Sequence, residues 1–329
     1  MTTRCGVVAT TAWLAVAAPA VAQRIAVGVP AVFASRVAEV IDGIAGDDAV
    51  VVATGTMAAS LSGEAVHVLL LQDEWTLARL AAADRLAPLD GEALSFVVPF
   101  TVPVVLACAD SGFVVGGADI AWDELALRPE LHDRLGLAAP EVDGGPWLCA
   151  FREALRRGGS EDHGIAIWTT LDARAGRLVT SVDEVLEGLR GGSFAAAVGP
   201  ANWFTGPSAQ GRASLRTIPV RCGVQAAYGS GLLAGAPPAA RGVFRRLDAD
   251  TARRSLAAAA GFAVADGAAG AIDPGNAVAW WRRFDAEVRG RGRSVERIAD
   301  WLDAVFAVLF LVVAFVAWRT LRRAPAERG

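Results

Sequence analysis

The stretch Gly63-Glu-Ala-Val-His-Val-Leu-Leu-Leu-Gln-Asp-Glu-Trp75 joins a strand to the start of a helix. Residues 66–71 form a short apolar run, which predicts a strand that is covered on both faces. A helix is expected from about residue 75 through Ala87, and Pro88 stops it. The polar residues 72–75 then lie at the carboxyl end of a strand, which is where open α/β sheets bind their ligands.

The same alternation of strand and helix occurs upstream of this stretch. Residues 25–30 and 49–53 predict two further strands. We expect a helix after the first of them, with Ser35 as its cap, and another helix from about Met57. Strands that alternate with helices predict a parallel sheet with covered faces, so the fold class is α/β.

A long apolar segment with two prolines, residues 96–108, follows this sheet. Because proline confines a strand to an edge or crossing position, we interpret the segment as a crossing between two lobes. The length of 329 residues also favours two lobes. The expected divisions are the first part of lobe 1 at 23–108, lobe 2 at 109–216, a return crossing with closing helices at 217–264, and a linker at 265–275.

The two ends of the chain predict export and anchoring. Residues 1–22 have the charged start, apolar run and small-residue end of a secretory signal peptide, with an uncleaved anchor as the alternative. Residues 301–321 predict a transmembrane helix, and the arginines beyond it favour a cytoplasmic tail at 322–329. A buried helix of a soluble core is the alternative. We also expect a juxtamembrane helix at 276–300 that docks on a partner or on anionic headgroups.

Composition narrows the possible functions. The chain has 31 basic and 35 acidic residues, no lysine and a net charge of −4, so a nucleic-acid partner is not expected. A Walker-type phosphate loop requires a lysine, and no Gly-x-Ser-x-Gly motif of a hydrolase is present. The three histidines are scattered, which argues against a zinc site. We therefore assign no catalytic residue, cofactor or metal site and expect a binding protein rather than an enzyme.

Several segments, residues 80–89 and 232–237 among them, resemble the type II periplasmic solute-binding proteins of ABC transporters, over residues 24–262. Residues 63–75 resemble the family's G-x-x-x-D-V-x-x-x-Q-D stretch, with His67 in place of Asp. Residues 122–132 resemble a W-x-D-L-x-x-P-x-x-K-G segment, and residues 182–204 fit as well. The resemblance implies a two-lobed type II periplasmic-binding-protein fold with interlobe crossing strands, to which the sequence adds the C-terminal transmembrane helix.

The resemblance is greatest to the ferric-iron-binding branch, but the iron ligands of that branch are absent. In the branch an N-H-Y-Y-x-F stretch supplies paired tyrosines, whereas Ala201 and Asn202 occupy those places here. Tyr228 is the only tyrosine in the chain. Because neither alanine nor a carboxamide supplies the anionic oxygen that Fe(III) favours, a tyrosinate iron site is not expected.

The resemblance places several side chains at the cleft between the lobes. Loops after the first two strands offer backbone N–H groups at helix starts, which favour an anion, although plain capping is the alternative. For Asp73 the alternative is a solvated acid that caps a helix, and for Trp147 and Trp203 it is a tryptophan of the core. The candidate ligand-binding residues are Ala34, Ser35, Gly55, Thr56, Gln72, Asp73, Trp147, Asn202 and Trp203.

The resemblance implies an extracytoplasmic solute-binding protein of an ABC-type import system that binds a small, anionic solute. Its expected partners are that solute, an ABC permease or other membrane protein, and the membrane through the C-terminal helix. It would be a single-pass protein of the cell membrane with the binding domain on the periplasmic or extracellular side. The alternative is a membrane-anchored sensor or assembly subunit that has kept the fold without an uptake role.

The cysteines add one further expectation. Removal of the signal peptide leaves Cys108, Cys149 and Cys222, an odd number. Cys108 and Cys222 lie at the ends of the two proposed crossings, which run side by side in the implied architecture. We therefore predict a disulfide between them, with three buried thiols as the alternative.

Overall fold

Six strands form the sheet of lobe 1. The computed structural model describes residues 24–54, 66–89, 94–108, 118–175, 178–205, 215–223, 225–265, 272–290 and 310. The strand order is β10-β4-β9-β3-β1-β2, in which β1 runs parallel to β2 and β3 while β9 is antiparallel to β3 and β4. The strands are β1 (Ile25–Pro30), β2 (Ala49–Thr54), β3 (Val68–Asp73), β4 (Phe96–Val102), β9 (Ala226–Leu232) and β10 (Ala263–Val264).

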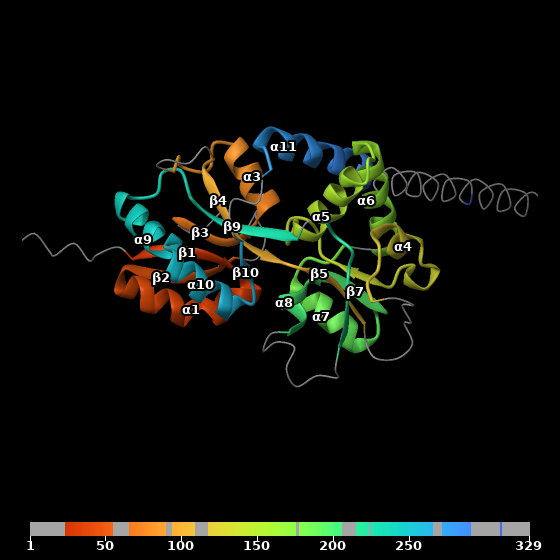
Figure 1. Ribbon diagram of the computed structural model, residues 1–329, viewed down its shortest axis with the longest axis horizontal. Coiled ribbons are helices and arrows are strands. Elements are labelled where there is room, and N and C mark those ends of the chain that lie inside the picture. Colours follow the sequence, from red (N-terminus) through yellow and green to blue (C-terminus); the bar gives the residue numbers. More distant parts are fainter. Residues whose placement is uncertain are drawn as a thin grey trace, which may run out of the picture.

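Helices cover this sheet because its central strands are buried along their whole length. Every residue of β3 and β9 is buried, as the continuous apolar run predicts. In Figure 1, α1 lies below the strands and α3 above them. The helical segments of lobe 1 are α1 (Ala31–Ala45), η1 (Gly46–Asp48), α3 (Glu74–Ala82), α9 (Pro238–Asp248) and α10 (Asp250–Ala260).

Lobe 2 contains a smaller sheet with the order β6-β7-β5-β8. Its strands are β5 (Val104–Cys108), β6 (Leu135–Leu137), β7 (Ala196–Pro200) and β8 (Arg216–Pro219). Its helical segments are α4 (Trp122–Leu127), η2 (Pro129–Leu131), α5 (Gly145–Arg156), α6 (Glu161–Ala175), α7 (Val182–Gly191) and α8 (Ala201–Thr205).

Two segments of chain connect the lobes. At Pro103, β4 of the first sheet passes directly into β5 of the second. The chain returns from β8 to β9, which extends toward lobe 2 in Figure 1. These connections coincide with the segments 96–108 and 216–222 in which the sequence predicts crossings.

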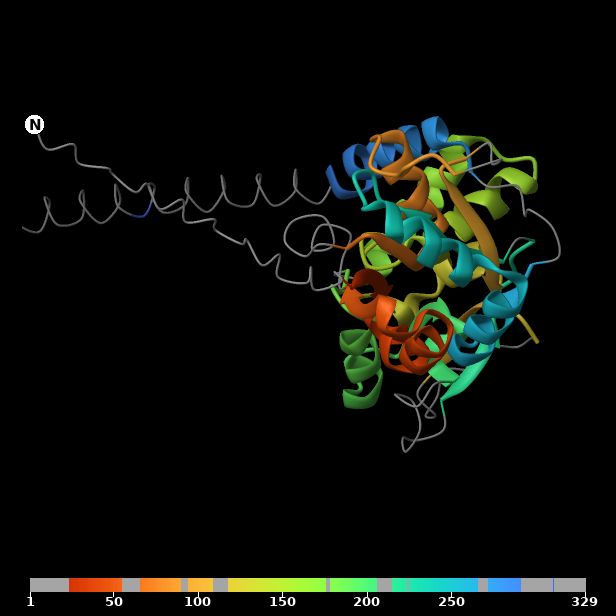
Figure 2. The same ribbon diagram turned by 90° about the vertical axis from the view of Figure 1, so that its left-hand side faces the viewer.

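A helix at residues 274–289, called the C-terminal helix from here on, forms a third bridge between the lobes. It comprises α11 (Pro274–Arg283) and a π-helical continuation, η3 (Phe284–Arg289), and lies beside α3 in Figure 2. The indole of Trp75 on α3 donates a 3.0 Å hydrogen bond to the Ala277 carbonyl, and the indole of Trp280 donates a 2.9 Å bond to Glu161 of α6. The helix expected to dock on a partner or on headgroups therefore packs on both lobes of its own chain.

An aromatic cluster joins this helix to the lobes. Trp75 of lobe 1 stacks on Trp168 of lobe 2 with ring centroids 5.1 Å apart. Phe284 of η3 meets both rings edge to face, at 6.1 and 5.4 Å. Offset and edge-to-face aromatic pairs add stabilisation beyond the area that they bury. The contact between α3, α6 and the C-terminal helix is therefore a core between lobes.

Two helix boundaries differ from those expected. Helix α1 begins at Ala31, with Pro30 at the N-cap position, so Ser35 is an exposed residue of the second turn and not a cap. Helix α3 ends at Ala82, because Asp84 adopts a positive φ of 54° and Leu86 forms a bridge to Leu233 at the end of the sheet. The closing helices expected near residues 238–260 are α9 and α10, which extended backbone at Ala249 separates.

Several expectations lie outside the described residues. These are the signal peptide, Gly55 and Thr56, most of the linker, the cytoplasmic tail and the transmembrane helix apart from Phe310. Within the described ranges, no helix combines the length and apolar character needed to cross a bilayer.

Candidate functional site

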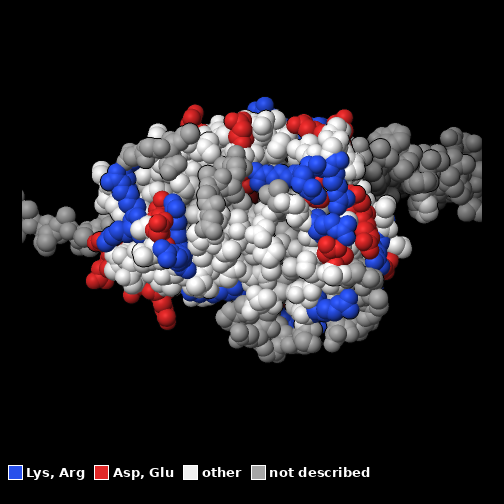
Figure 3. All heavy atoms as spheres, viewed as in Figure 1, with Lys and Arg blue, Asp and Glu red and all other residues white. Residues whose placement is uncertain are grey.

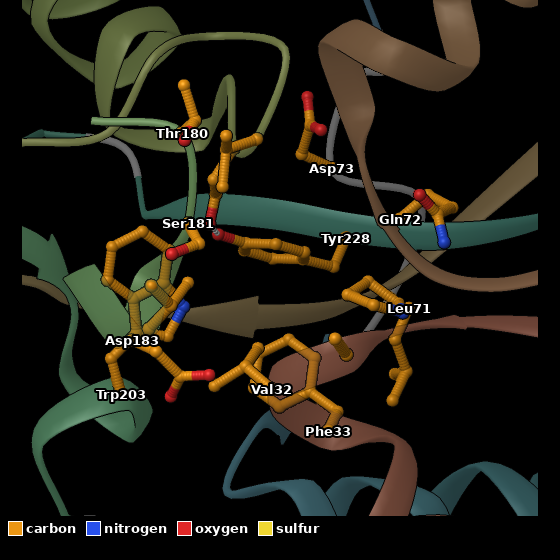
Figure 4. A pocket seen from close by; sticks show the side chains of 15 residues that line it. Val32, Phe33, Leu71, Gln72, Asp73, Thr180, Ser181, Asp183, Trp203 and Tyr228 are labelled. Atoms are coloured by element: carbon orange, nitrogen blue, oxygen red, sulfur yellow. Dashed lines mark hydrogen bonds between the residues drawn. The ribbon is translucent and has the colours of Figure 1, made fainter. Parts of the chain in front are cut away.

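A cleft between the lobes, with a cavity volume of about 80 Å³, is the candidate binding site. Residues of lobe 1 line it from the β1–α1 junction and the end of β3, and residues of lobe 2 line it from the segment before α5, the start of α7 and α8. Figure 4 shows the ring of Tyr228, on β9, crossing the floor between the two walls. The lining residues are Pro30, Ala31, Val32, Phe33, Leu71, Gln72, Asp73, Val142, Asp143, Thr180, Ser181, Val182, Asp183, Trp203 and Tyr228.

A bulge in β3 sets the direction of the lobe 1 wall. The register with β9 shifts between Leu69 and Gln72, and Leu71 has a positive φ of 57°. A bulge turns the following side chains relative to the regular pleat, and a non-glycine residue in this conformation costs about 1–3 kcal/mol. Gln72 and Asp73 consequently end the strand at the cleft, and Asp73 caps α3 by accepting a 2.9 Å hydrogen bond from Thr76 N–H.

Two buried carboxyl groups face the cleft. Asp143 accepts a 2.6 Å hydrogen bond from the Tyr228 hydroxyl and a 2.8 Å bond from Gly145 N–H. Burial, and next the negative charge of Asp73, raise the pKa of Asp143 to about 8. Burial also raises the pKa of Asp73, while hydrogen bonds from Thr76 and Gly144 and the charge of Arg79 oppose that increase. At neutral pH the pair therefore holds a proton that a cationic ligand can displace.

The lobe 2 wall adds a third carboxylate and a hydrogen-bond donor. Ser181 caps α7 by accepting a 3.1 Å bond from Glu184 N–H, and Asp183 follows in the first turn of the helix. Trp203 on α8 is 1% exposed, and its indole N–H has no hydrogen-bond partner within the described part of the chain. A buried donor without a partner is costly, so a ligand that offers an acceptor would gain from it.

The structure brings three of the expected site residues together at the cleft, namely Gln72, Asp73 and Trp203. Ala34 lies in the core of lobe 1, and Ser35 points to solvent. Trp147 is a core residue that donates a 2.8 Å hydrogen bond to the Ala138 carbonyl. Gly55 and Thr56 lie outside the described residues.

Asn202 lies beside the cleft, at a contact between the lobes. Its side chain is buried and donates a 3.0 Å hydrogen bond to the Ala260 carbonyl, while Arg36 of α1 donates a 2.9 Å bond to its backbone oxygen. The side-chain oxygen of Asn202 has no hydrogen-bond partner among the described residues. Asn202 therefore joins lobe 2 to lobe 1.

Sequence reasoning missed Asp143, Tyr228 and Asp183. Asp143 had a usable signal, since it directly precedes the Gly144-Gly145 turn at the start of α5. Tyr228 had none within its own segment, because it reaches the site only through the pairing of β9 with β3, in which it lies opposite Asp73.

The predicted disulfide between Cys108 and Cys222 is wrong. Cys108 lies opposite Arg216 at the start of β8. Cys222 follows the other end of that strand, six residues from Arg216 and therefore about 20 Å along an extended chain. A disulfide requires Cα atoms within about 7 Å, so this pair cannot form one.

Charged residues outside the cleft are largely paired. Arginine side chains lie next to acidic ones on both lobes of the face seen in Figure 3. Within the described residues, no three histidine, cysteine or acidic side chains are grouped to hold a metal ion.

The architecture described above is the two-lobed fold of periplasmic binding proteins. The chain matches the structure of AfuA from Actinobacillus pleuropneumoniae with fructose-6-phosphate bound, with a TM-score of 0.62 and 11% identity over 81% of this chain and 98% of that one. It also matches the sulfate-binding protein SubI from Mycobacterium tuberculosis, with a TM-score of 0.58 and 17% identity over 81% of this chain and 91% of that one.

A third match is iron-bound HitA from Pseudomonas aeruginosa, with a TM-score of 0.56 and 14% identity over 79% of this chain and 98% of that one. The sequence itself matches no protein-family model and none of the curated proteins compared with it. The structural matches to periplasmic binding proteins, iron-binding members included, confirm the resemblance inferred from the sequence and establish the fold.

We expect Gly145→Ala to damage the carboxyl pair directly. A Cβ atom at this position would lie 2.8 Å from the Tyr228 hydroxyl and 2.9 Å from an Asp143 carboxylate oxygen. The variant should lose about 1–3 kcal/mol of unfolding free energy, measured by urea denaturation. Gly43→Ala is the matched control, because a Cβ there meets nothing within 4 Å, and it should stabilise α1 by about 0.5–1 kcal/mol. Equal effects in the two variants would contradict the crowded geometry at Gly145.

Proposed function

We propose that the chain is a solute-binding protein of an ABC-type import system that closes its two lobes around a small solute. The observation that carries this proposal is the cleft, to which both lobes and the β9 crossing contribute residues. A ligand that contacts both walls stabilises the closed arrangement over any open one, which is how such a protein converts binding into a change of shape. The proteins of like fold support the proposal, because their structures include ones with a sugar phosphate or iron bound and one that binds sulfate.

The chemistry of the lining favours a solute that carries both a cationic group and an acceptor. Asp73, Asp143 and Asp183 line the cleft, and no arginine is among the described lining residues. A protonated amine matches the carboxyl groups, and an acceptor group matches the unpaired indole N–H of Trp203. The sequence favoured a simple anion because helix starts were expected at the cleft. Helix α1 does begin there, at Ala31, but Ser35 lies outside the cleft and Thr56 lies outside the described residues. We therefore propose an amine-bearing or zwitterionic solute in its place.

Anchoring remains part of this proposal. The apolar run at 301–321 and the signal-like residues 1–22 support a single-pass protein whose binding domain lies outside the cytoplasmic membrane, where it would meet a permease. The sensor or assembly subunit is the alternative. It would be favoured if no small solute bound and the full-length protein were recovered in a complex with an unrelated membrane enzyme.

The decisive experiment is a solute screen on the full-length protein. Primary amines, amino acids and simple oxyanions are added in turn, and the melting temperature and tryptophan fluorescence are recorded. We expect amine-bearing or zwitterionic solutes to raise the melting temperature. Trp203→Phe, which removes the indole N–H together with the five-membered ring that carries it, should weaken binding about tenfold.

Ser35→Ala is the matched control for this screen. Ser35 is exposed and does not line the cleft, so the affinity of this variant for the solute should equal that of the unaltered protein. No response to any solute, or a loss of binding in Ser35→Ala alone, would contradict the proposed site.

A further inference from the structure

Two cysteine side chains meet at the crossing that returns from lobe 2 to lobe 1. Cys149 lies on α5, and Cys222 lies between β8 and β9. The Cys149 thiol forms a hydrogen bond with Cys222, and the indole of Trp122 donates a 3.2 Å hydrogen bond to Cys222 Sγ. The backbone beside Cys222 is held against the same helix, because Gly223 N–H donates a 2.7 Å bond to Glu153 of α5. These contacts hold Cys222 against α5, beside Cys149.

The two thiols differ in access and acidity. Cys149 is 2% exposed, whereas Cys222 is only partly buried. The hydrogen bond from Cys149 lowers the pKa of Cys222 despite its burial, while the same bond and burial raise the pKa of Cys149. The thiolate is the nucleophile in thiol–disulfide exchange, so Cys222 is the group that reacts first and Cys149 is the group that resolves the intermediate.

We propose that Cys149 and Cys222 form an intrachain disulfide that fixes the return crossing to α5. The oxidant is a disulfide carrier, either a thiol–disulfide oxidoreductase or oxidised glutathione. The Cys222 thiolate attacks the carrier disulfide, a mixed disulfide forms, and one carrier thiolate leaves. Cys149 then gives its proton to solvent and attacks Cys222 Sγ, which expels the second carrier thiolate. Two protein thiols have become one disulfide, and the carrier disulfide has become two thiols.

The location of the pair gives the bond a mechanical effect. The return crossing is one of the segments that must bend when the lobes move, and a bond from Cys222 to α5 attaches it to lobe 2 immediately before β9 begins. The bond would also close the loop from residue 149 to residue 222, which restricts the unfolded chain. A rise in melting temperature of about 10 °C is expected for a loop of this length in a protein of this size.

Cys108 provides an internal control. It is 2% exposed on β5, between β7 and β8, and burial raises the pKa of its thiol to about 11. A buried thiol of high pKa reacts slowly with disulfides. If any cysteine of the chain could be oxidised, Cys108 would be oxidised as well. If only cysteines in contact form a disulfide, Cys108 should remain a thiol.

The test uses the full-length protein, purified with reductant and then equilibrated with oxidised glutathione. Remaining thiols are alkylated, and the digest is mapped by mass spectrometry without reduction. We expect one linked peptide pair that contains Cys149 and Cys222, alkylated Cys108, and a melting temperature that falls by about 10 °C when dithiothreitol is added. Thiols at both Cys149 and Cys222 after equilibration would overturn the proposal, as would a glutathione adduct on Cys222 that persists.

Two variants separate the bond from general effects on folding. Cys222→Ser should abolish the difference in melting temperature between oxidised and reduced protein. Cys108→Ser should keep that difference in full, even if it lowers both temperatures. A difference that survives in Cys222→Ser would overturn the assignment. The readout is independent of solute binding, so the proposed function and this proposal can fail separately.

Discussion

The affinity of the cleft for an amine-bearing solute should rise about 50-fold between pH 6 and pH 8. The pKa of Asp143 is raised to about 8, so only about one molecule in a hundred carries its carboxylate at pH 6 and about half do at pH 8. A cationic group binds the ionised form and must displace the proton from the neutral form. Affinity is therefore lost as the pH falls below the pKa of Asp143 in the folded protein.

Isothermal titration at pH 6, 7 and 8 measures this change, and a comparison of buffers with different ionisation enthalpies counts the proton released. Asp143→Asn keeps the shape of the side chain but cannot ionise, so its weaker affinity should be nearly independent of pH over this range. An affinity that falls as the pH rises would instead identify an anion as the ligand. Without solute, the free energy of unfolding should change in the opposite direction to the affinity. Because the pKa of Asp143 is raised in the folded protein, the free energy of unfolding falls as the pH rises from about 4 to 8.

Loss of the Glu74 carboxylate should remove about 3–4 kcal/mol of unfolding free energy. Glu74 at the start of α3 is 1% exposed and accepts hydrogen bonds of 2.7 and 2.8 Å from the two terminal nitrogens of Arg152 on α5. It also accepts a bond from Ile272 N–H, just before α11. Glu74→Gln would leave the largely buried Arg152 without this counter-charge and would weaken the junction of both lobes with the C-terminal helix.

The control for this prediction is an arginine–glutamate pair at the surface. Glu124 accepts a 2.7 Å hydrogen bond from Arg128 within lobe 2, and both residues are partly exposed. Exposed pairs contribute little because water screens them, so Glu124→Gln should cost less than about 1 kcal/mol. Urea denaturation of both variants measures the difference. Similar small losses in the two would show that the Glu74 pair does not hold the lobes together.

The crossings and the lobe 1 sheet could be predicted because their signals are local. Prolines confine residues 96–108 to a crossing, and continuous apolar runs identify β1 and β3. Gln72 and Asp73 could be placed at the cleft because the carboxyl end of a strand is fixed once the strand is recognised. Ser35 was misplaced by a plausible cap motif, since the helix instead begins directly after Pro30.

The remainder of the site depends on contacts between distant segments. Tyr228 meets Asp143 only because β9 returns to pair with β3, and that register is not encoded within either strand alone. The tryptophans of α11 have the composition of a membrane-border segment, yet Trp280 is 8% exposed and bonded to α6. A hydrophobic face indicates that a helix is covered, but it does not say what covers it.

The stacked pair of Trp75 and Trp168 gives the molecule an optical marker of its own. The two indoles come from different lobes, and their planes lie 23° apart. Chromophores held so close couple their electronic transitions, which produces a paired positive and negative band in the circular dichroism spectrum. The strength of that band depends on the angle and separation of the rings. The alignment of the lobes can therefore be followed in solution without any added label.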